Sequence, residues 1–200
     1  MTWVKVCGIT CEEDLEVAEA AGADAVGLVV APSSPRAVAV DRARRLARRT
    51  SLATVLVTVD LDPGELLSLA ATTGVTHVQP HGAGRVEAAA AALAEGLEVL
   101  FPVGVGAAVE ATVPPAGATV LYDRASPRHG GTGTGFDWSL VVDAPGPYVL
   151  AGGLGPDNVA EAVARLDPWG VDASSRLEVA PGRKDPRKVV EFVRRAKGEG

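Results

Sequence analysis

The sequence contains little cysteine and no long apolar run. Its 200 residues include two cysteines, Cys7 and Cys11, which lie four positions apart near the N-terminus. This spacing provides no disulfide framework, which predicts a reducing compartment such as the cytoplasm. No stretch reaches the roughly 18 apolar residues of a membrane span, and the N-terminus lacks the long apolar region of a signal peptide. We therefore expect a cytoplasmic protein with no membrane partner.

Positive charge and aromatic rings are also in short supply. The formal net charge is −6 at pH 7, and aromatic residues make up 4% of the chain. A nucleic-acid-binding protein needs a basic surface, and binding of single strands also needs stacking platforms. Five arginines cluster within residues 42–49, but Leu46 and the alanines there would face inward, so we interpret the cluster as the solvated face of a helix. No nucleic-acid partner is expected.

Short apolar runs alternate with helical patterns from one end of the chain to the other. Several of these runs are continuous in Val, Leu and Ala, as parallel strands covered on both faces require. We predict strands at Trp3–Ile9, Ala25–Val30, Ala53–Val59, His77–His81, Glu98–Val105, Thr119–Asp123, Tyr148–Ala151 and Gly170–Ala173. We predict helices at Glu12–Ala21, Asp41–Arg49, Pro63–Thr72, Arg85–Ala94, Pro156–Arg165 and Pro186–Lys197, and a short one at Asp137–Val142.

The alternation predicts an α/β protein, a single-domain (β/α)8 TIM barrel. Residues 106–117 lack a clear helix, but no composition break or linker divides the chain, so residues 1–200 are expected to form one domain. An open doubly wound sheet would also alternate strands and helices. This sequence has no Gly-x-Gly-x-x-Gly after its first strand, which favours the closed barrel.

Cys7 is the first candidate for catalysis, because functional groups of such barrels collect at the C-terminal ends of the strands. The thiol follows an apolar strand and precedes a glycine and a predicted helix start. We expect the helix dipole and neighbouring charges to lower its pKa and make it reactive, the alternative being an inert buried thiol. A metal site at Cys7 and Cys11 is not expected, since no further Cys/His cluster supplies the remaining ligands.

Three other polar residues lie at the ends of predicted strands or in the segments after them. Asp123 ends the sixth strand, where its carboxyl group either caps the next loop or points into the barrel mouth. In the second case it would form an acid/base pair with Cys7. Arg36 could bind a substrate carboxylate through its planar fork, or it could be a surface arginine. His81 is interpreted as a core or rim histidine.

Glycines and serines near the last two strands suggest an anion site. Gly152 and Gly153 would let the backbone approach a ligand closely, and Ser174 and Ser175 would add hydroxyl donors. Loops at this place in a barrel often hold a phosphate through backbone N–H groups. The alternative is that the glycines merely form tight turns.

Together the motifs resemble the phosphoribosylanthranilate isomerase family of tryptophan biosynthesis, in the family's order and over nearly the whole chain. The resemblance rests on residues 5–10 (KVCGIT), 22–27 (GADAVG), 34–36 (SPR), 78–82 (VQPHG), Asp123, 130–133 (GGTG), 136–138 (FDW), 152–159 (GGLGPDNV), 171–175 (VDASS) and 181–185 (PGRKD). It implies a TIM barrel that catalyses a cofactor-free Amadori rearrangement of a small sugar-phosphate substrate.

The resemblance also implies a role for each candidate. Asp123 would be the general acid that opens the furanose ring, and Cys7, as thiolate, would remove the proton from C2′. Arg36 would bind the anthranilate carboxylate. The phosphate would be bound by Gly152, Gly153, Ser174 and Ser175. Possible further substrate contacts are His81, Asp172 and Arg176.

Three positions depart from the family's pattern. Pro80 stands where the family has leucine, and it removes a donor from an interior strand, so we expect a bend there. Arg176 replaces a glycine, and it would be strained at a positive φ. It could contact the phosphate or crowd it. Residues 27–31 offer less aromatic area than the family's phenylalanines.

These departures leave two alternatives open. One is a paralogue that acts on a related aminoaldose phosphate. The other is a phosphate-binding barrel without turnover, against which both Cys7 and Asp123 are present. No exposed apolar stripe predicts an interface, so we expect a monomer, with a dimer as the alternative.

Overall fold

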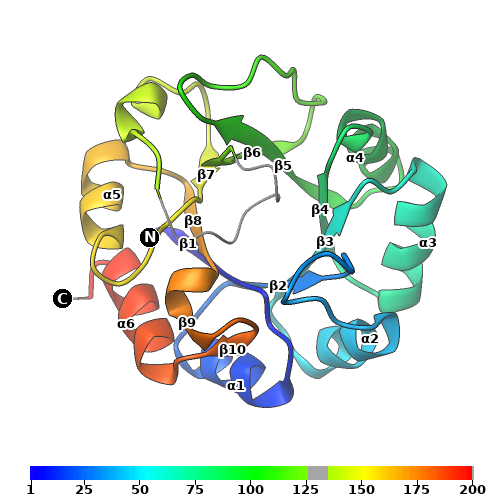
Figure 1. Cartoon of the computed structure of the whole chain (residues 1–200), viewed down its shortest axis with the longest axis horizontal. Helices are drawn as coiled ribbons and strands as arrows, with labels where there is room; N and C mark the ends of the chain where they lie inside the picture. Colours follow the sequence, from blue (N-terminus) through cyan, green and yellow to red (C-terminus); the bar gives the residue numbers. More distant parts are fainter. Residues whose placement is uncertain (126–134, 200) are drawn as a thin grey trace.

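Eight parallel strands close into a barrel in the order of the sequence, each hydrogen-bonded to the next and the last to the first (Figure 1). The structure is a computed structural model, and it describes residues 1–125 and 135–199. The strands are β1 (Trp3–Cys7), β2 (Ala25–Val29), β3 (Ala53–Val59), β4 (His77–His81), β5 (Glu98–Val105), β6 (Thr119–Arg124), β7 (Tyr148–Leu150) and β8 (Gly170–Ala173). The barrel predicted from the alternating pattern is confirmed, and so are the strands, with ends that shift by at most two residues.

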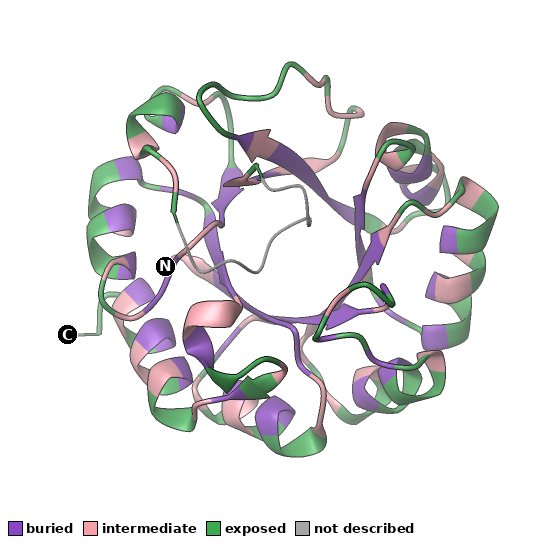
Figure 2. Cartoon of the chain, in the orientation of Figure 1, coloured by how far each residue is buried: buried purple, intermediate pink, exposed green. Residues whose placement is uncertain are grey.

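Helices surround the barrel and bury the faces that they turn toward it (Figure 2). They are α1 (Glu12–Ala20), α2 (Val40–Arg49), α3 (Pro63–Thr73), α4 (Arg85–Ala94), α5 (Val159–Leu166) and α6 (Pro186–Ala196). Between β5 and β6 residues 106–118 form no helix, and the predicted short helix after β6 is a 3-10 turn, η1 (Trp138–Val141). Each helix within the described ranges is too short or too polar to cross a membrane.

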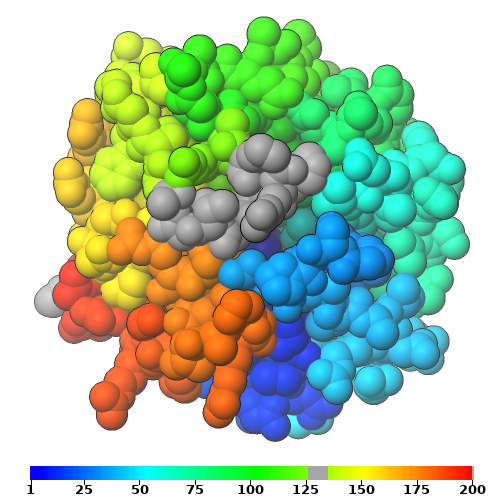
Figure 3. Space-filling model, viewed as in Figure 1, coloured from blue at the N-terminus to red at the C-terminus, as the bar shows by residue number. Residues whose placement is uncertain are grey.

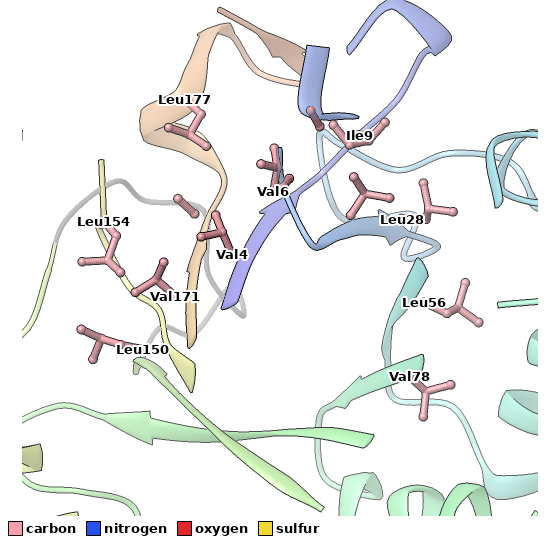
Figure 4. Packing of buried hydrophobic residues seen from close by; sticks show 14 of the residues in the cluster. Val4, Val6, Ile9, Leu28, Leu56, Val78, Leu150, Leu154, Val171 and Leu177 are labelled. Carbon is pink, nitrogen blue, oxygen red and sulfur yellow. The ribbon is translucent and has the colours of Figure 1, made fainter. Parts of the chain in front are cut away.

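Two apolar layers hold these elements together. The larger lies between strands and helices, where Val4 and Val6 of β1 pack near Val171 of β8 and Leu150 of β7 (Figure 4). The smaller fills the barrel and includes Cys7. Because successive side chains of a strand point to opposite faces, residues 4 and 6 face the helices and residues 5 and 7 face the interior.

The helix starts depend on local capping, which sequence signals identified in part. Asp62 and Glu65 form a capping box at the start of α3. The predicted start of α5 at Pro156 is wrong: the helix begins at Val159, because the Asn158 side chain accepts a hydrogen bond from the N–H of Gly155 (2.8 Å) and holds the preceding residues in a turn.

Pro80 changes how β4 meets its neighbours. Pairing with β3 continues to His81, whereas pairing with β5 is confined to His77 with Glu98 and Val78 with Val99. Proline has no N–H to donate. The expected disturbance therefore takes the form of a shortened ladder toward β5, while β4 itself remains a strand.

A short hairpin after β8 was not predicted. The 3-10 turn η2 (Ser175–Leu177) leads into β9 (Glu178–Ala180), which pairs with β10 (Arg183–Lys184) in an antiparallel sheet. The hydroxyl of Thr10, in the segment after β1, donates to the carbonyl of Gly182 in the hairpin turn (2.6 Å). The hairpin thus places Glu178 and Lys184 next to the end of the first strand.

Candidate active site

Cys7 lies at the C-terminal end of β1, inside the barrel and 8% exposed. Its neighbour on β2 is Gly27, and a Cβ atom at that position would fall 2.5 Å from the sulfur. The sulfur therefore occupies the space that any other residue at position 27 would fill.

Below Cys7, the ammonium group of Lys5 is fully buried in the barrel. It donates to Oε1 of Gln79 (2.8 Å) and to Oδ2 of Asp172 (3.0 Å), linking β1 to β4 and β8. Lys5 and Gln79 were not among the predicted site residues. The available signal was a lysine at an inward-facing position of an otherwise apolar strand.

The expectation that the surroundings lower the pKa of Cys7 is wrong. Burial raises the pKa of this thiol above its ordinary value, and the carboxylate of Asp172 adds to the rise. Lys5 and Lys184 act in the opposite direction. The helix dipole does not compensate, because α1 begins five residues after Cys7 and its first turn contains three acidic residues, Glu12, Glu13 and Asp14.

Asp123 lies near the end of β6 and lines a cavity of about 620 Å³. Burial raises the pKa of its carboxyl group to about 6, with a further contribution from Asp172, while the backbone N–H of Arg124 and the charge of Lys5 oppose the rise. A Cβ at Gly152 would lie 3.1 Å from Oδ1 of Asp123. The carboxyl group therefore faces the barrel mouth, and with this pKa a minority of the molecules still carry its proton at neutral pH.

The same cavity extends from Asp123 toward β3, β4 and β5. Its charged and polar lining residues are Asp60, His81, Arg85, Glu110, Asp123 and Arg124. His81 is 9% exposed, and its Nε2 lies 3.0 Å from Nε2 of Gln79, in agreement with the interpretation as a rim histidine.

Arg36 is buried at the mouth, so the surface alternative is wrong. Its Nε and Nη2 donate to the two carboxylate oxygens of Glu178 at 2.7 and 2.8 Å. A Cβ at Gly8 would lie 2.6 Å from Cδ of Arg36, which places the arginine stem against the backbone next to Cys7. The segments after β2 (blue) and after β8 (orange) accordingly lie side by side in Figure 3.

Lys184 completes this ion pair from the hairpin. It is 2% exposed, and its ammonium group donates to Oε1 of Glu178 (3.0 Å) and to the carbonyl of Ser174 (3.3 Å). Glu178 and Lys184 were missed because β9 and β10 are too short to give a periodic pattern.

The predicted anion site lies at the ends of β7 and β8. Gly152 and Gly153 have φ of 79° and 74°, and a Cβ at Gly152 would lie 2.7 Å from the backbone nitrogen of Arg124. Both features require glycine. Ser174 donates its hydroxyl to the carbonyl of Cys7 (3.0 Å), and Ser175 begins η2. The structure brings the predicted residues together. Their contacts among the described residues are compatible both with a phosphate site and with tight turns.

Arg176 joins the two loops of this site. Its Nη1 donates to the carbonyl of Gly153 (2.9 Å), and its Nη2 donates to both carboxylate oxygens of Asp157 (2.7 and 2.6 Å). The expected strain is absent, because the non-glycine residues at positive φ in the described ranges are Asp60 and Asp167. The position lies in a 3-10 turn, which an arginine adopts freely.

Of the glycine-rich loop after Asp123, residues 130–134 lie outside the described residues. For metals, no group of three or more His, Cys, Asp or Glu side chains in the described part of the chain is arranged to hold an ion.

Comparisons with known proteins agree on one family. Residues 4–195 match the family described as N-(5'phosphoribosyl)anthranilate (PRA) isomerase. A relative from Rubrobacter xylanophilus, named N-(5'-phosphoribosyl)anthranilate isomerase, is 43% identical over 98% of this chain and 100% of its own length.

Solved structures give the same result. Monomers generated from the dimeric phosphoribosylanthranilate isomerase of Thermotoga maritima superpose with a TM-score of 0.84 and 33% identity, over 99% of this chain and 100% of that one. A phosphoribosyl anthranilate isomerase in complex with reduced 1-(o-carboxyphenylamino)-1-deoxyribulose 5-phosphate has a TM-score of 0.83 and 33% identity over the same shares.

Proposed function

The chain belongs to the N-(5'-phosphoribosyl)anthranilate isomerase family, and from this premise we propose how its residues carry out the reaction. It is an isomerase of tryptophan biosynthesis that acts on a small sugar-phosphate substrate. The reaction is an Amadori rearrangement of N-(5'-phosphoribosyl)anthranilate to 1-(2-carboxyphenylamino)-1-deoxyribulose 5-phosphate. Which residues act in each step is the proposal.

Asp123 is the general acid of the first step. Its proton goes to the furanose ring oxygen, the bond from that oxygen to C1′ breaks, and the nitrogen lone pair forms the C1′=N bond of a protonated Schiff base. A carboxyl group with a pKa raised to about 6 supports this role, because it still carries a proton near neutral pH in part of the molecules.

Cys7 is the general base of the second step. Its thiolate takes the proton from C2′, the C–H electron pair forms the C1′=C2′ bond, and the iminium electrons return to nitrogen. The enolamine then tautomerises to the ketone, with a proton lost from the C2′ hydroxyl and one gained at C1′. The position of Cys7 on β1, inside the mouth that Asp123 faces from β6, supports the pair.

Binding is divided between two groups of residues. Arg36 holds the anthranilate carboxylate with Nη1, since Nε and Nη2 are used on Glu178. The phosphate is held by Gly152, Gly153, Ser174 and Ser175. His81 and Asp172 make further substrate contacts. In support, Oδ1 of Asp172 is buried and has no hydrogen-bond partner among the described residues.

The observation that carries the proposal is the raised pKa of a carboxyl group that faces the same mouth as a buried thiol. A bacterium lacking this isomerase tests it. We expect the native chain to restore growth without tryptophan, and Cys7→Ala and Asp123→Asn to fail although folded. Rescue by Cys7→Ala would disprove the role of Cys7 as the base.

Arg176 was the reason to consider a related aminoaldose phosphate as the substrate. Its side chain binds Asp157 and the Gly153 carbonyl, so no second function is proposed.

Location and assembly are also proposals. Two free cysteines are in keeping with the cytoplasm. A monomer is supported by exposed apolar side chains that lie on separate elements, among them Val113, Trp169 and Val190. The Thermotoga maritima relative described as dimeric is the contrary precedent. Sedimentation equilibrium over a range of concentrations decides between them.

A further inference from the structure

Lys5 and Cys7 are alternate residues of β1, and both face the interior of the barrel. Lys5 is fully buried, although an ammonium group is costly to bury unless it is paired and hydrogen-bonded. Asp172 at 3.0 Å and Gln79 at 2.8 Å hold two of its three N–H groups. Lys5 is thus fixed in place below the sulfur by bonds from β4 and β8.

We propose that Lys5 is a positioning residue that stabilises Cys7 as the thiolate, with Asp172 and Gln79 holding its ammonium group in place. The proposal deepens the assignment of Cys7 as the base, and it rests on that assignment. It adds the cation that the base requires, because a buried sulfur anion without one would be as costly as any buried lone charge.

The charges around the sulfur favour Lys5 over the other cations. The charged groups near Cys7 are Lys5 of its own strand, Asp172 of β8, Lys184 of β10 and Arg36 of the segment after β2, and Gly27 of β2 adds none. Lys184 and Arg36 share the single carboxylate of Glu178. Lys5 opposes the rise in the pKa of Cys7 more strongly than Lys184 does.

Lys5 and Asp172 act on the thiol with opposite signs, which separates this role from a structural one. Loss of the ammonium group removes the charge that stabilises the thiolate. Loss of the Asp172 carboxylate removes a charge that disfavours it, since Asp172 raises the pKa of Cys7. If Lys5 only tied three strands together, removing either partner would loosen the barrel in the same way.

The test follows the ionisation of Cys7 directly. Cys11→Ser serves as the parent, because Cys11 only precedes α1 and makes no side-chain cap. Thiolate absorbance against pH, minus that of the Cys7→Ser/Cys11→Ser protein, gives the midpoint, and the rate of alkylation by iodoacetamide against pH gives it independently. We expect Lys5→Met to move the midpoint to higher pH and to slow alkylation at pH 7 about tenfold or more, since a neighbouring opposite charge typically shifts a pKa by about one unit or more.

Asp172→Asn is expected to move the midpoint the other way, to lower pH. A folded Lys5→Met protein with an unchanged midpoint overturns the proposal, as do two variants that shift in the same direction. Should Lys5→Met fail to fold, Gln79→Glu adds a carboxylate to the same ammonium with little change of shape, and it must raise the midpoint. These titrations do not depend on turnover, so rescue of growth by Cys7→Ala would refute the role of the base and leave the measured role of Lys5 standing.

Discussion

The sulfur of Cys7 occupies the side-chain space of Gly27. An alanine Cβ at position 27 would lie 2.5 Å from Sγ and 3.1 Å from Cα of Cys7, so the thiol or its strand has to move. Displacement of a reacting group by about 1 Å costs up to about a hundredfold in rate. We expect Gly27→Ala to lower kcat ten- to hundredfold with little change in KM, measured by steady-state kinetics.

Gly64→Ala is the matched control, because the added Cβ would meet only an oxygen of Asp62, at 3.3 Å, and no atom of Cys7. Its kcat should equal that of the native chain. A Gly27→Ala protein with native kcat would contradict the placement of the thiol.

The pH dependence of kcat/KM follows from the two ionisations. We expect a bell-shaped profile with one limb at about pH 6, from Asp123, and the other at the raised pKa of Cys7. The active enzyme has Asp123 protonated and Cys7 ionised. Because the acid has the lower pKa, only a minority of the molecules are in this protonation state at pH values between the two limbs. Since Asp172 raises the pKa of both groups, Asp172→Asn should move both limbs to lower pH. A profile of free enzyme without a limb near pH 6 argues against Asp123 as the acid.

Glu178 forms ion pairs with two buried cations, Arg36 and Lys184. Glu178→Gln leaves both charges uncompensated, and removing one partner of a buried pair typically costs about 3–5 kcal/mol. We expect the free energy of unfolding in urea to fall by about that amount. Glu12→Gln, which breaks a half-exposed pair with Arg49, should cost at most about 1 kcal/mol. Equal losses in the two variants would show that the buried pair carries no special weight.

The Arg176 bridge should affect binding rather than chemistry. Arg176→Gly removes both the ion pair to Asp157 and the bond to the Gly153 carbonyl, whereas Asp157→Asn removes the ion pair alone. We expect KM to rise about two- to fivefold in each variant with kcat nearly unchanged, the size of a partly exposed ion pair. The double variant should match Arg176→Gly, because that change already removes the ion pair. A lower KM in Arg176→Gly would instead mean that the arginine crowds the phosphate.

The barrel could be predicted because its signals are local. Continuous apolar runs such as Ala53–Val59 and Glu98–Val105 have the bounds that the pattern predicted. Cys7 and Asp123 could be singled out because the ends of parallel strands meet at one rim. That argument needs only their positions along the chain.

The contacts that tune these residues depend on distant parts of the chain. Lys5 meets Gln79 and Asp172 across 74 and 167 positions of sequence, and nothing in the neighbourhood of Lys5 identifies either partner. The direction of the Cys7 pKa was mistaken for the same reason. Burial, which the three-dimensional structure alone determines, outweighs the nearby cations.

The seam of the barrel wall between β4 and β5 is paired along only part of its length. Between β4 and β5 the ladder stops at Val78 and Val99, and both strands carry a proline further up, Pro80 and Pro102, which can offer no donor to extend it. His81 of β4 and Gly104 of β5 line the cavity above that point, so a molecule that enters the mouth meets the part of this seam that the strand ladder does not close.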